Sequence, residues 1–514
     1  MPRATPRRRP WPRTPAGDRL TRRRLLGLTV GAASAALASA CAPRVRPDAG
    51  VAVNDLHSRL NPTTVARVTT PATLEALQAE IRAAAAEGRA VSIRGGNHAM
   101  GGQQFGAGTV LLDTRRLARV LAFDAERGLV EAEAGIQWPA LIDHLLAAQR
   151  GRPRPWGIVQ KQTGADRLTL GGALAANVHG RGLTLRPIVG DVEAFTLVGA
   201  DGAPRRVSRR EHSELFRLVI GGYGLLGAVA TVTLRLAPRV KVERVVELLD
   251  VDDLAARFDA RIRQGFRFGD FQYATDPASD LLLRRGVFSC YRPVPDATAM
   301  PAEPRELVVA DWERLLYLSH ADKGRAFQEY AAYYLSTSGQ LYWSDTHQLS
   351  VYLDDYHRAL DRRLGPGRAG TEMISELYVP RARLAALFDA VRRDVRAHGV
   401  DVIYGTVRLI ERDDETVLAW AREPWACTIV NLHVEHTPAG VAKAADDFRR
   451  LIDRALEQGG SYFPTYHRWA DRRQVEAAHP RLVEFLRAKR RHDPEERFQS
   501  DWYRHHRDLL ADRL

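Results

Sequence analysis

A glycine cluster that also holds a histidine is the segment of this sequence best suited to do chemistry. It follows the short apolar stretch at 90–93 and reads Arg94-Gly95-Gly96-Asn97-His98-Ala99-Met100-Gly101-Gly102-Gln103. Glycine allows unusual backbone angles, so several N–H groups can converge on one point and form an anion-binding nest. This geometry suits a pyrophosphate, which does not itself need a histidine. The cluster therefore predicts a phosphate-binding loop with an additional imidazole function.

A second glycine-rich turn lies about seventy residues further on, at 168–182. It reads Leu168-Thr169-Leu170-Gly171-Gly172-Ala173-Leu174-Ala175-Ala176-Asn177-Val178-His179-Gly180-Arg181-Gly182.

Alternating helices and strands are expected to position these turns. A helix should begin at Thr70 as N-cap, with Pro71 in its first turn, and should end before Gly88. It leads into the strand before the first glycine cluster. Further strands are expected at 110–114, 129–134, 191–198 and 228–236, and helices at 138–149 and 211–219. This mixture predicts an α+β domain.

A third glycine-rich run, Gly222 to Gly227, matches the G-x-G-x-x-G dinucleotide fingerprint. That fingerprint requires a strand before it and a helix after it, because the pyrophosphate sits on the helix N-terminus. Here a helix is expected before the run and a strand after it. The sequence therefore argues against a Rossmann-type NAD site.

The order and spacing of the two turns resemble the FAD-binding domain of the vanillyl-alcohol oxidase / p-cresol methylhydroxylase (PCMH) family. The resemblance implies a two-part, PCMH-type FAD-binding domain followed by an α+β substrate domain, the cap. In the first loop it implies cofactor contacts from Arg94, Gly95, Gly96, Asn97, His98, Ala99 and Gly101. His98 stands where many members bond the flavin covalently; its alternative role is that of a structural loop histidine. Ala99 replaces the serine found in many members.

In the second loop the resemblance places Gly171 and Gly172 against the isoalloxazine. Asn177, His179 and Gly180 would approach the ribityl and phosphate groups, with His179 alternatively a structural hydrogen-bonding residue. Further flavin or adenine contacts are implied for Thr163, Gly164 and Val229.

The substrate side carries three residues suggested by family-like motifs. Glu376 begins an E-x-x-V-P-like stretch, Arg408 matches the arginine of an E-x-R motif, and His467 matches the histidine of a P-H-W-G-K segment. Threonine replaces the E-x-R acid, and the lysine of the last motif is lost. We expect His467 as base or substrate orienter and Arg408 as a polar clamp.

The implied reaction is hydride transfer from a CH–OH carbon of a sugar-, lactone- or polyol-like small molecule to the flavin, with O2 or another electron acceptor. Alternatives are oxidation of an amine, as in cytokinin dehydrogenase, and a noncatalytic exported flavin- or ligand-binding protein.

The charge distribution argues against nucleic acid as a partner. The 514-residue chain has a net charge of +13, but residues 1–40 hold nine arginines and one acid. Without that segment, 66 basic and 61 acidic side chains remain, a net charge of +5.

That arginine-rich start resembles a twin-arginine export signal. Arg22 and Arg23 precede an apolar run from Leu25 to Ala40, too short for a comfortable membrane span. Export to the periplasm or another extracytoplasmic space is expected, with a membrane anchor only if Cys41 is lipidated or the segment stays uncleaved. The three cysteines show no metal-ligand spacing, so no metal site is expected.

The sequence thus divides into a signal at 1–40 and a linker at 41–61, followed by an FAD-binding domain at 62–238, a substrate domain at 239–458 and a C-terminal return segment at 459–514.

Overall fold

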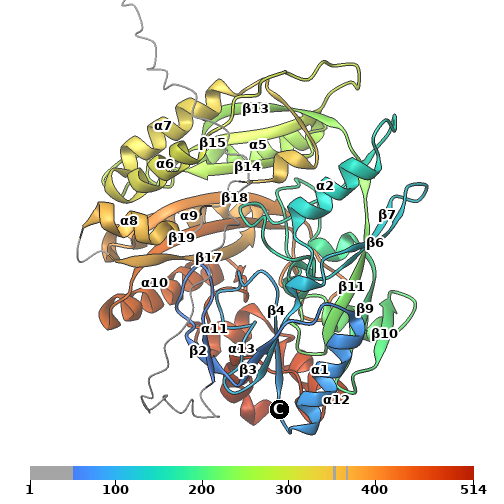
Figure 1. The fold of residues 1–514 in the computed structure, drawn as a ribbon. Helices are drawn as coiled ribbons and strands as arrows, with labels where there is room; N and C mark the ends of the chain where they lie inside the picture. Colours follow the sequence, from blue (N-terminus) through green and yellow to red (C-terminus); the bar gives the residue numbers. More distant parts are fainter. Residues whose placement is uncertain (1–49, 351–352, 354, 366–368) are drawn as a thin grey trace, which may run out of the picture. The chain divides into compact units, whose positions relative to one another are not determined.

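The first glycine cluster follows a strand of a small parallel sheet. The computed structural model describes residues 50–350, 353, 355–365 and 369–514. In it, β5 (Val110–Asp113) lies between β3 (Arg67–Thr69) and β4 (Val91–Arg94), all parallel. The glycine cluster leaves the carboxyl end of β4 (Figure 1).

The helix before β4 begins three residues later than expected. Helix α1 (Leu74–Ala86) has Thr73 as its N-cap, whose hydroxyl accepts a 3.1 Å hydrogen bond from the Ala76 N–H. Thr73 reaches the N–H that a cap must satisfy, so the assignment of the cap to Thr70 is wrong. The expected C-terminal stop is confirmed by Gly88, with φ of +65°.

A five-stranded antiparallel sheet follows the parallel sheet along the chain and ends at residue 235. Its order is β10-β9-β11-β7-β6, and Gly202 turns the β9–β10 hairpin with φ of +70°. Helix α4 (Ser213–Val219) precedes the G-x-G-x-x-G run and β11 follows it, so the prediction that this run is no Rossmann fingerprint is confirmed. The strands are β6 (Val120–Asp124), β7 (Leu129–Glu133), β9 (Val192–Val198), β10 (Pro204–Ser208) and β11 (Ala228–Arg235), and helices α2 (Trp138–Ala148) and α3 (Leu170–Ala176) lie between β7 and β9 in the sequence.

An eight-stranded sheet forms the centre of the remaining chain, in the order β16-β13-β15-β14-β18-β19-β17-β20. Its strands are β13 (Lys241–Asp250), β14 (Phe268–Tyr273), β15 (Arg285–Pro293), β16 (Leu341–Trp343), β17 (Gly370–Pro380), β18 (Val402–Ile410), β19 (Trp425–Glu435) and β20 (Ser461–Tyr462). All of the pairings are antiparallel.

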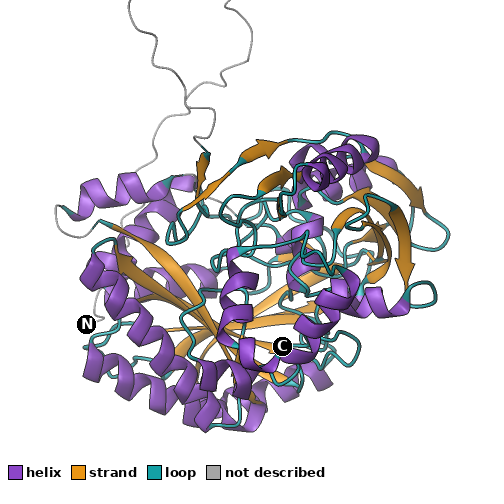
Figure 2. Cartoon of the chain, turned by 90° about the horizontal axis from the view of Figure 1, so that it is seen from below, coloured by secondary structure: helices purple, strands orange, loops and turns teal. Residues whose placement is uncertain are grey.

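Helices pack on both faces of this sheet (Figures 1 and 2). On β15, Val287 packs with Ala331 of α7, whereas its neighbour Phe288 meets Phe258 of α5 edge to face, with ring centroids 4.8 Å apart. Successive strand residues point to opposite faces, so α5 and α7 cover different faces. The helices are α5 (Val251–Arg263), α6 (Val309–Ala321), α7 (Lys323–Ser336), α8 (Tyr356–Leu364), α9 (Leu384–His398) and α10 (Pro438–Glu457).

The C-terminal segment returns to the first sheet. The Val91 N–H donates to the Arg497 carbonyl at 2.6 Å, and the Asp501 N–H donates to the Phe105 carbonyl. This segment contains α11 (Arg472–Ala478), α12 (Leu482–His492) and α13 (Asp501–Leu509). Near the other end, β1 (Val51–Val53) pairs with β2 (Thr63–Val65), so the described part of the expected linker contains a strand.

The elements together form an α+β fold, as predicted. Among the described residues, no helix combines the length and apolar character needed to cross a bilayer.

Candidate cofactor and substrate site

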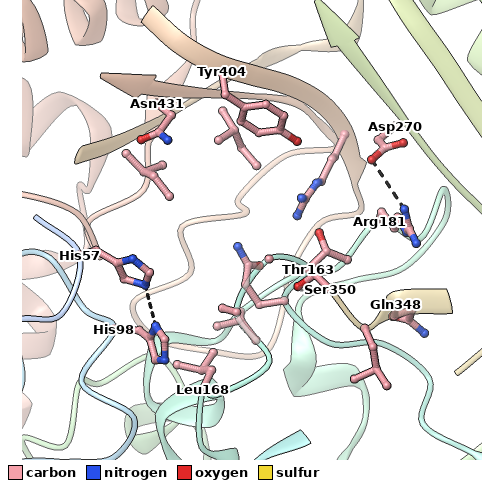
Figure 3. Close-up of a pocket in the computed structure, with 18 of the residues that line it drawn as sticks. His57, His98, Thr163, Leu168, Arg181, Asp270, Gln348, Ser350, Tyr404 and Asn431 are labelled. Atoms are coloured by element: carbon pink, nitrogen blue, oxygen red, sulfur yellow. Dashed lines mark hydrogen bonds and ion pairs between the residues drawn. The ribbon is translucent and has the colours of Figure 1, made fainter. Parts of the chain in front are cut away.

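A cavity of about 1130 Å³ lies between the glycine-rich segments and the large sheet. This volume lies just above the range of about 300–1,000 Å³ that is usual for small-molecule sites. Glycines from four separate segments line the cavity and are called the glycine wall: Gly95, Gly96, Gly164, Gly171, Gly172, Gly224 and Gly227. Figure 3 shows the space enclosed by side chains from both parts of the fold.

The first glycine loop packs directly against the segment before α3. A Cβ built on Gly95 would lie 1.9 Å from the Thr169 hydroxyl oxygen, and one on Gly96 would lie 2.2 Å from the Arg167 carbonyl oxygen. Neither distance is sterically possible, so both positions require glycine. Asn97 turns the chain with φ of +64°, and its side-chain amide donates to the Asn54 carbonyl at 2.7 Å.

His98 lines the cavity and meets a second histidine. Its Nδ1 lies 2.6 Å from Nε2 of His57, which also lines the cavity (Figure 3). Burial, with further contributions from His57 and Arg167, lowers the pKa of His98 to about 3. The imidazole is therefore neutral at ordinary pH and keeps a nitrogen lone pair, the form needed for attack on an electrophilic carbon.

His57 is a site residue that the sequence did not reveal. Burial lowers its pKa despite the opposing charge of Asp55. The Asp55 carboxylate accepts hydrogen bonds from the backbone N–H groups of His57 and Ser58 and so fixes this turn. No local motif links His57 to a loop forty-one residues away.

The second glycine-rich stretch is a helix start rather than only a turn. Thr169 caps α3 by accepting from the Gly172 N–H at 3.2 Å, and Gly171 and Gly172 lie in the first helical turn, facing the cavity. The helix ends at Asn177 (φ +47°), whose side chain bonds to Asp413 and to the Val189 N–H. The interpretation of the whole stretch as a turn is therefore corrected, because threonine at 169 supplies an N-cap.

His179 and Glu376 form a buried pair outside the cavity lining. His179 Nε2 lies 2.7 Å from Glu376 Oε1, His179 Nδ1 lies 3.0 Å from the Gly180 carbonyl, and the Cys427 thiol donates to the same carboxylate oxygen at 3.1 Å. Burial raises the pKa of Glu376, but His179 and Cys427 outweigh it and hold the pKa below its usual value. These contacts tie the second loop to β17 and β19.

Arg408 on β18 presents unsatisfied donors to the cavity. The side chain is buried and lines the cavity, yet its Nε and Nη1 have no hydrogen-bond partner among the described residues. Leaving charged donors unsatisfied is costly, so an acceptor oxygen in this part of the cavity would be stabilised by Arg408. On neighbouring strands the Gln272 amide donates to the Tyr404 hydroxyl at 2.6 Å, and Asn431 lies nearby in Figure 3.

His467 packs away from the cavity lining. Its ring centroid lies 3.8 Å from that of Trp469, and burial together with the charge of Arg468 lowers its pKa to about 3.

Two residues of the first glycine cluster also have structural contacts. Arg94 pairs with Asp113, and a Cβ on Gly101 would lie 2.3 Å from the Tyr466 carbonyl oxygen.

The cavity thus brings together some of the expected site residues and not others. Lining it are Gly95, Gly96, Asn97, His98, Ala99, Thr163, Gly164, Gly171, Gly172, Val229 and Arg408. Arg94, Gly101, Asn177, His179, Gly180, Glu376 and His467 are outside the lining. Residues not anticipated from the sequence include His57, Arg181, Asp270, Gln272, Tyr404 and Asn431, most of them on strands whose pairing no local pattern encodes.

Comparison with known proteins bears on the same region. Residues 65–208 match a family model described as FAD binding domain. The chain is 30% identical over 169 residues to an uncharacterized oxidoreductase of Rhodococcoides fascians, covering 33% of this chain and 37% of the relative. It is 29% identical over 165 residues to decaprenylphosphoryl-beta-D-ribose oxidase of Mycolicibacterium smegmatis (32% and 34%), and 25% identical over 201 residues to L-gulonolactone oxidase of Bos taurus (38% and 44%).

The matches therefore span less than half the length of these relatives. Fold and site define an α+β protein with a large cavity lined by glycines. Residues 65–208 match an FAD binding domain, and the relatives similar to this chain include proteins named as oxidoreductase and oxidase.

Proposed function

We propose that the chain is an FAD-dependent oxidoreductase that oxidises a small molecule at a carbon bearing a hydroxyl group. The observation that carries the proposal is the continuity of one cavity, which joins the glycine wall to the unsatisfied donors of Arg408. When bound, FAD supplies the hydride acceptor. The protein's own residues bind both molecules, orient them and exclude water.

Buried polar atoms along the glycine wall support its role in holding the cofactor. The Thr163 hydroxyl and Gln104 Oε1 line the cavity and have no hydrogen-bond partner among the described residues. With the glycines of the first loop they offer both donors and acceptors to a polar dinucleotide. We also propose that His98, kept neutral by burial, would bond the flavin covalently at its 8-methyl carbon. The new bond would replace one C–H bond: the hydrogen would leave as a proton, the electron pair would reduce the flavin ring, and the electron acceptor used in turnover would reoxidise it.

The substrate would be held by Arg408 through an oxygen atom. Changing Arg408 to Gln removes the charge and part of the donor fork, and a charge-assisted hydrogen bond contributes about 1.5–3 kcal/mol. We expect kcat/KM to fall by roughly tenfold to a hundredfold, with flavin content unchanged. Exposed Arg412 provides the matched control, Arg412→Gln. Equal kcat/KM in the two variants would remove Arg408 from the substrate site.

The proposal is tested by mixing the purified protein, without oxygen, with polyols, aldonolactones, sugars and amines in turn. Bleaching of the flavin absorbance by a hydroxyl-bearing compound, followed by turnover in air or with an artificial acceptor, is the expected result. Bleaching by amines alone would replace the reaction class with amine oxidation. Failure of every compound to bleach a fully loaded flavin would favour a noncatalytic flavin protein.

We further propose export by the twin-arginine route, which carries folded proteins and would allow FAD to bind first. The signal and Cys41 lie outside the described residues. Changing both Arg22 and Arg23 to Lys should leave the precursor in the cytoplasm, as measured by cell fractionation and immunoblotting. Unchanged export of this variant would contradict the route.

A further inference from the structure

Several buried histidines surround one carboxylate at the edge of the cavity. Glu372 on β17 lines the cavity, while His320 comes from α6, His433 from β19 and His357 from α8. The side chains of all four are at most 5% exposed. Glu372 and His433 are directly paired across the β17–β19 ladder, which fixes their side chains on the same face.

Both distances from the Glu372 carboxylate to the two imidazoles fit neighbouring ligands of one metal ion, and only the shorter of them also fits a hydrogen bond. Glu372 Oε1 lies 3.1 Å from His320 Nε2 and 3.6 Å from His433 Nδ1. The three ligand atoms all lie within 4.8 Å of one another. Metal–ligand bonds of the usual length for zinc place tetrahedral neighbours about 3.3 Å apart. The second distance is too long for a hydrogen bond.

The second carboxylate oxygen has its own partners. Glu372 Oε2 lies 3.3 Å from His357 Nδ1 and accepts a hydrogen bond from the Tyr356 hydroxyl. Partners of this kind fix the orientation of a ligating carboxylate. A second cluster of possible metal ligands, His179, Glu376 and Cys427, is explained by hydrogen bonds alone. Its atoms lie 2.7 and 3.1 Å apart, which are ordinary hydrogen-bond distances.

The charge at this position also favours a cation. The Glu372 carboxylate is buried among three imidazoles, with its side chain only 4% exposed. A buried carboxylate that is ionised needs a compensating positive charge. In addition, His320 is fully buried, and neither ring nitrogen makes a hydrogen bond of good geometry to the described residues.

We propose that Glu372, His320 and His433 bind a divalent transition-metal ion, of which Zn²⁺ is the best match, at the wall of the cavity. Two imidazole nitrogens and one carboxylate oxygen suit Zn²⁺ and related transition metals rather than Mg²⁺ or Ca²⁺, which prefer oxygen. The site goes beyond the proposed oxidoreductase activity and departs from the expectation, drawn from cysteine spacing, of no metal. Its ligands lie far apart in the sequence, so no spacing motif could indicate it.

The experiment uses the full protein prepared without a polyhistidine tag. Metal content is measured by mass spectrometry after dialysis, and metal-depleted protein is then titrated with Co²⁺. Tetrahedral Co²⁺ absorbs at longer wavelengths than oxidised flavin, so the two can be read separately. The variants are Glu372→Gln, His320→Gln and the control His144→Gln, which removes an exposed histidine from α2. Flavin content is recorded for each variant.

We expect stoichiometric metal in the unmodified protein and in His144→Gln. Glu372→Gln and His320→Gln should each hold at least tenfold less, with the Co²⁺ spectrum lost and flavin content retained. Metal content in these two variants equal to that of the control would overturn the proposal and leave a hydrogen-bonded cluster. If Glu372→Gln does not fold, His320→Gln gives the same readout. Because flavin is measured separately, metal binding without FAD would refute the proposed function and leave this site standing.

Discussion

A Gly96→Ala chain is expected to purify with at least tenfold less FAD than the unmodified protein. The added methyl group would lie 2.2 Å from the Arg167 carbonyl oxygen and 2.8 Å from His98 Cδ2. The carbonyl belongs to backbone and cannot rotate away, so the whole loop must shift out of the glycine wall. Overpacking of this kind costs about 1–3 kcal/mol, and from about 1.4 kcal/mol upwards this is a loss of affinity of tenfold or more. The measurement is the ratio of flavin to protein absorbance after gel filtration.

Gly190→Ala is the matched control for that experiment. Its added Cβ would have its nearest neighbour at 3.7 Å, and Gly190 does not line the cavity. It should therefore retain full flavin and the unmodified thermal stability. Full flavin in Gly96→Ala would mean that the cofactor does not depend on the packing of this loop.

The second large effect is expected from His98→Ala. The unmodified protein should keep its flavin through acid precipitation and show a fluorescent band on a denaturing gel. The variant should release all of its flavin on denaturation while still binding it when folded, because the glycine wall is intact. The physical reason is the neutral His98 imidazole, whose pKa of about 3 leaves its lone pair unprotonated across the working pH range.

His347→Ala separates attachment from a general effect of losing a cavity histidine. His347 lines the same cavity from a different segment of the chain. The flavin of the His347→Ala variant should stay attached to the protein after denaturation. Quantitative release of flavin by acid from the unmodified protein would rule out the covalent bond. His98 would then be a noncovalent neighbour of the ring.

The sequence alone was sufficient to predict glycines that line the cavity. Glycine is favoured at 95 and 96 because a Cβ at either position would clash with Thr169 or Arg167, and Thr169 belongs to the second glycine-rich stretch. The G-x-G-x-x-G run was correctly excluded as a Rossmann site because the elements on either side stand in the wrong order. The exclusion of the Rossmann site depends only on the elements directly before and after the run, and the two glycine clusters are each visible within a few residues.

The substrate side could not be predicted in the same way. The residues of the substrate side line one cavity because the strands that carry them, β14, β18 and β19, are adjacent in the large sheet. No local sequence pattern indicates this strand order. The residues are Arg408, Gln272, Tyr404 and Asn431. His57 is missed because no local motif links it to His98, which lies forty-one residues away in the sequence. His467, chosen from a motif, packs against Trp469 instead. Its catalytic role and that of Glu376 remain predictions without a contact to the cavity.

The absorption spectrum of the purified, unmodified protein shows whether the chain holds FAD. We predict the visible bands of an oxidised flavin at one flavin per chain, still present after gel filtration and dialysis. A folded protein of normal stability that shows no flavin absorbance, even after incubation with excess FAD, would refute FAD binding.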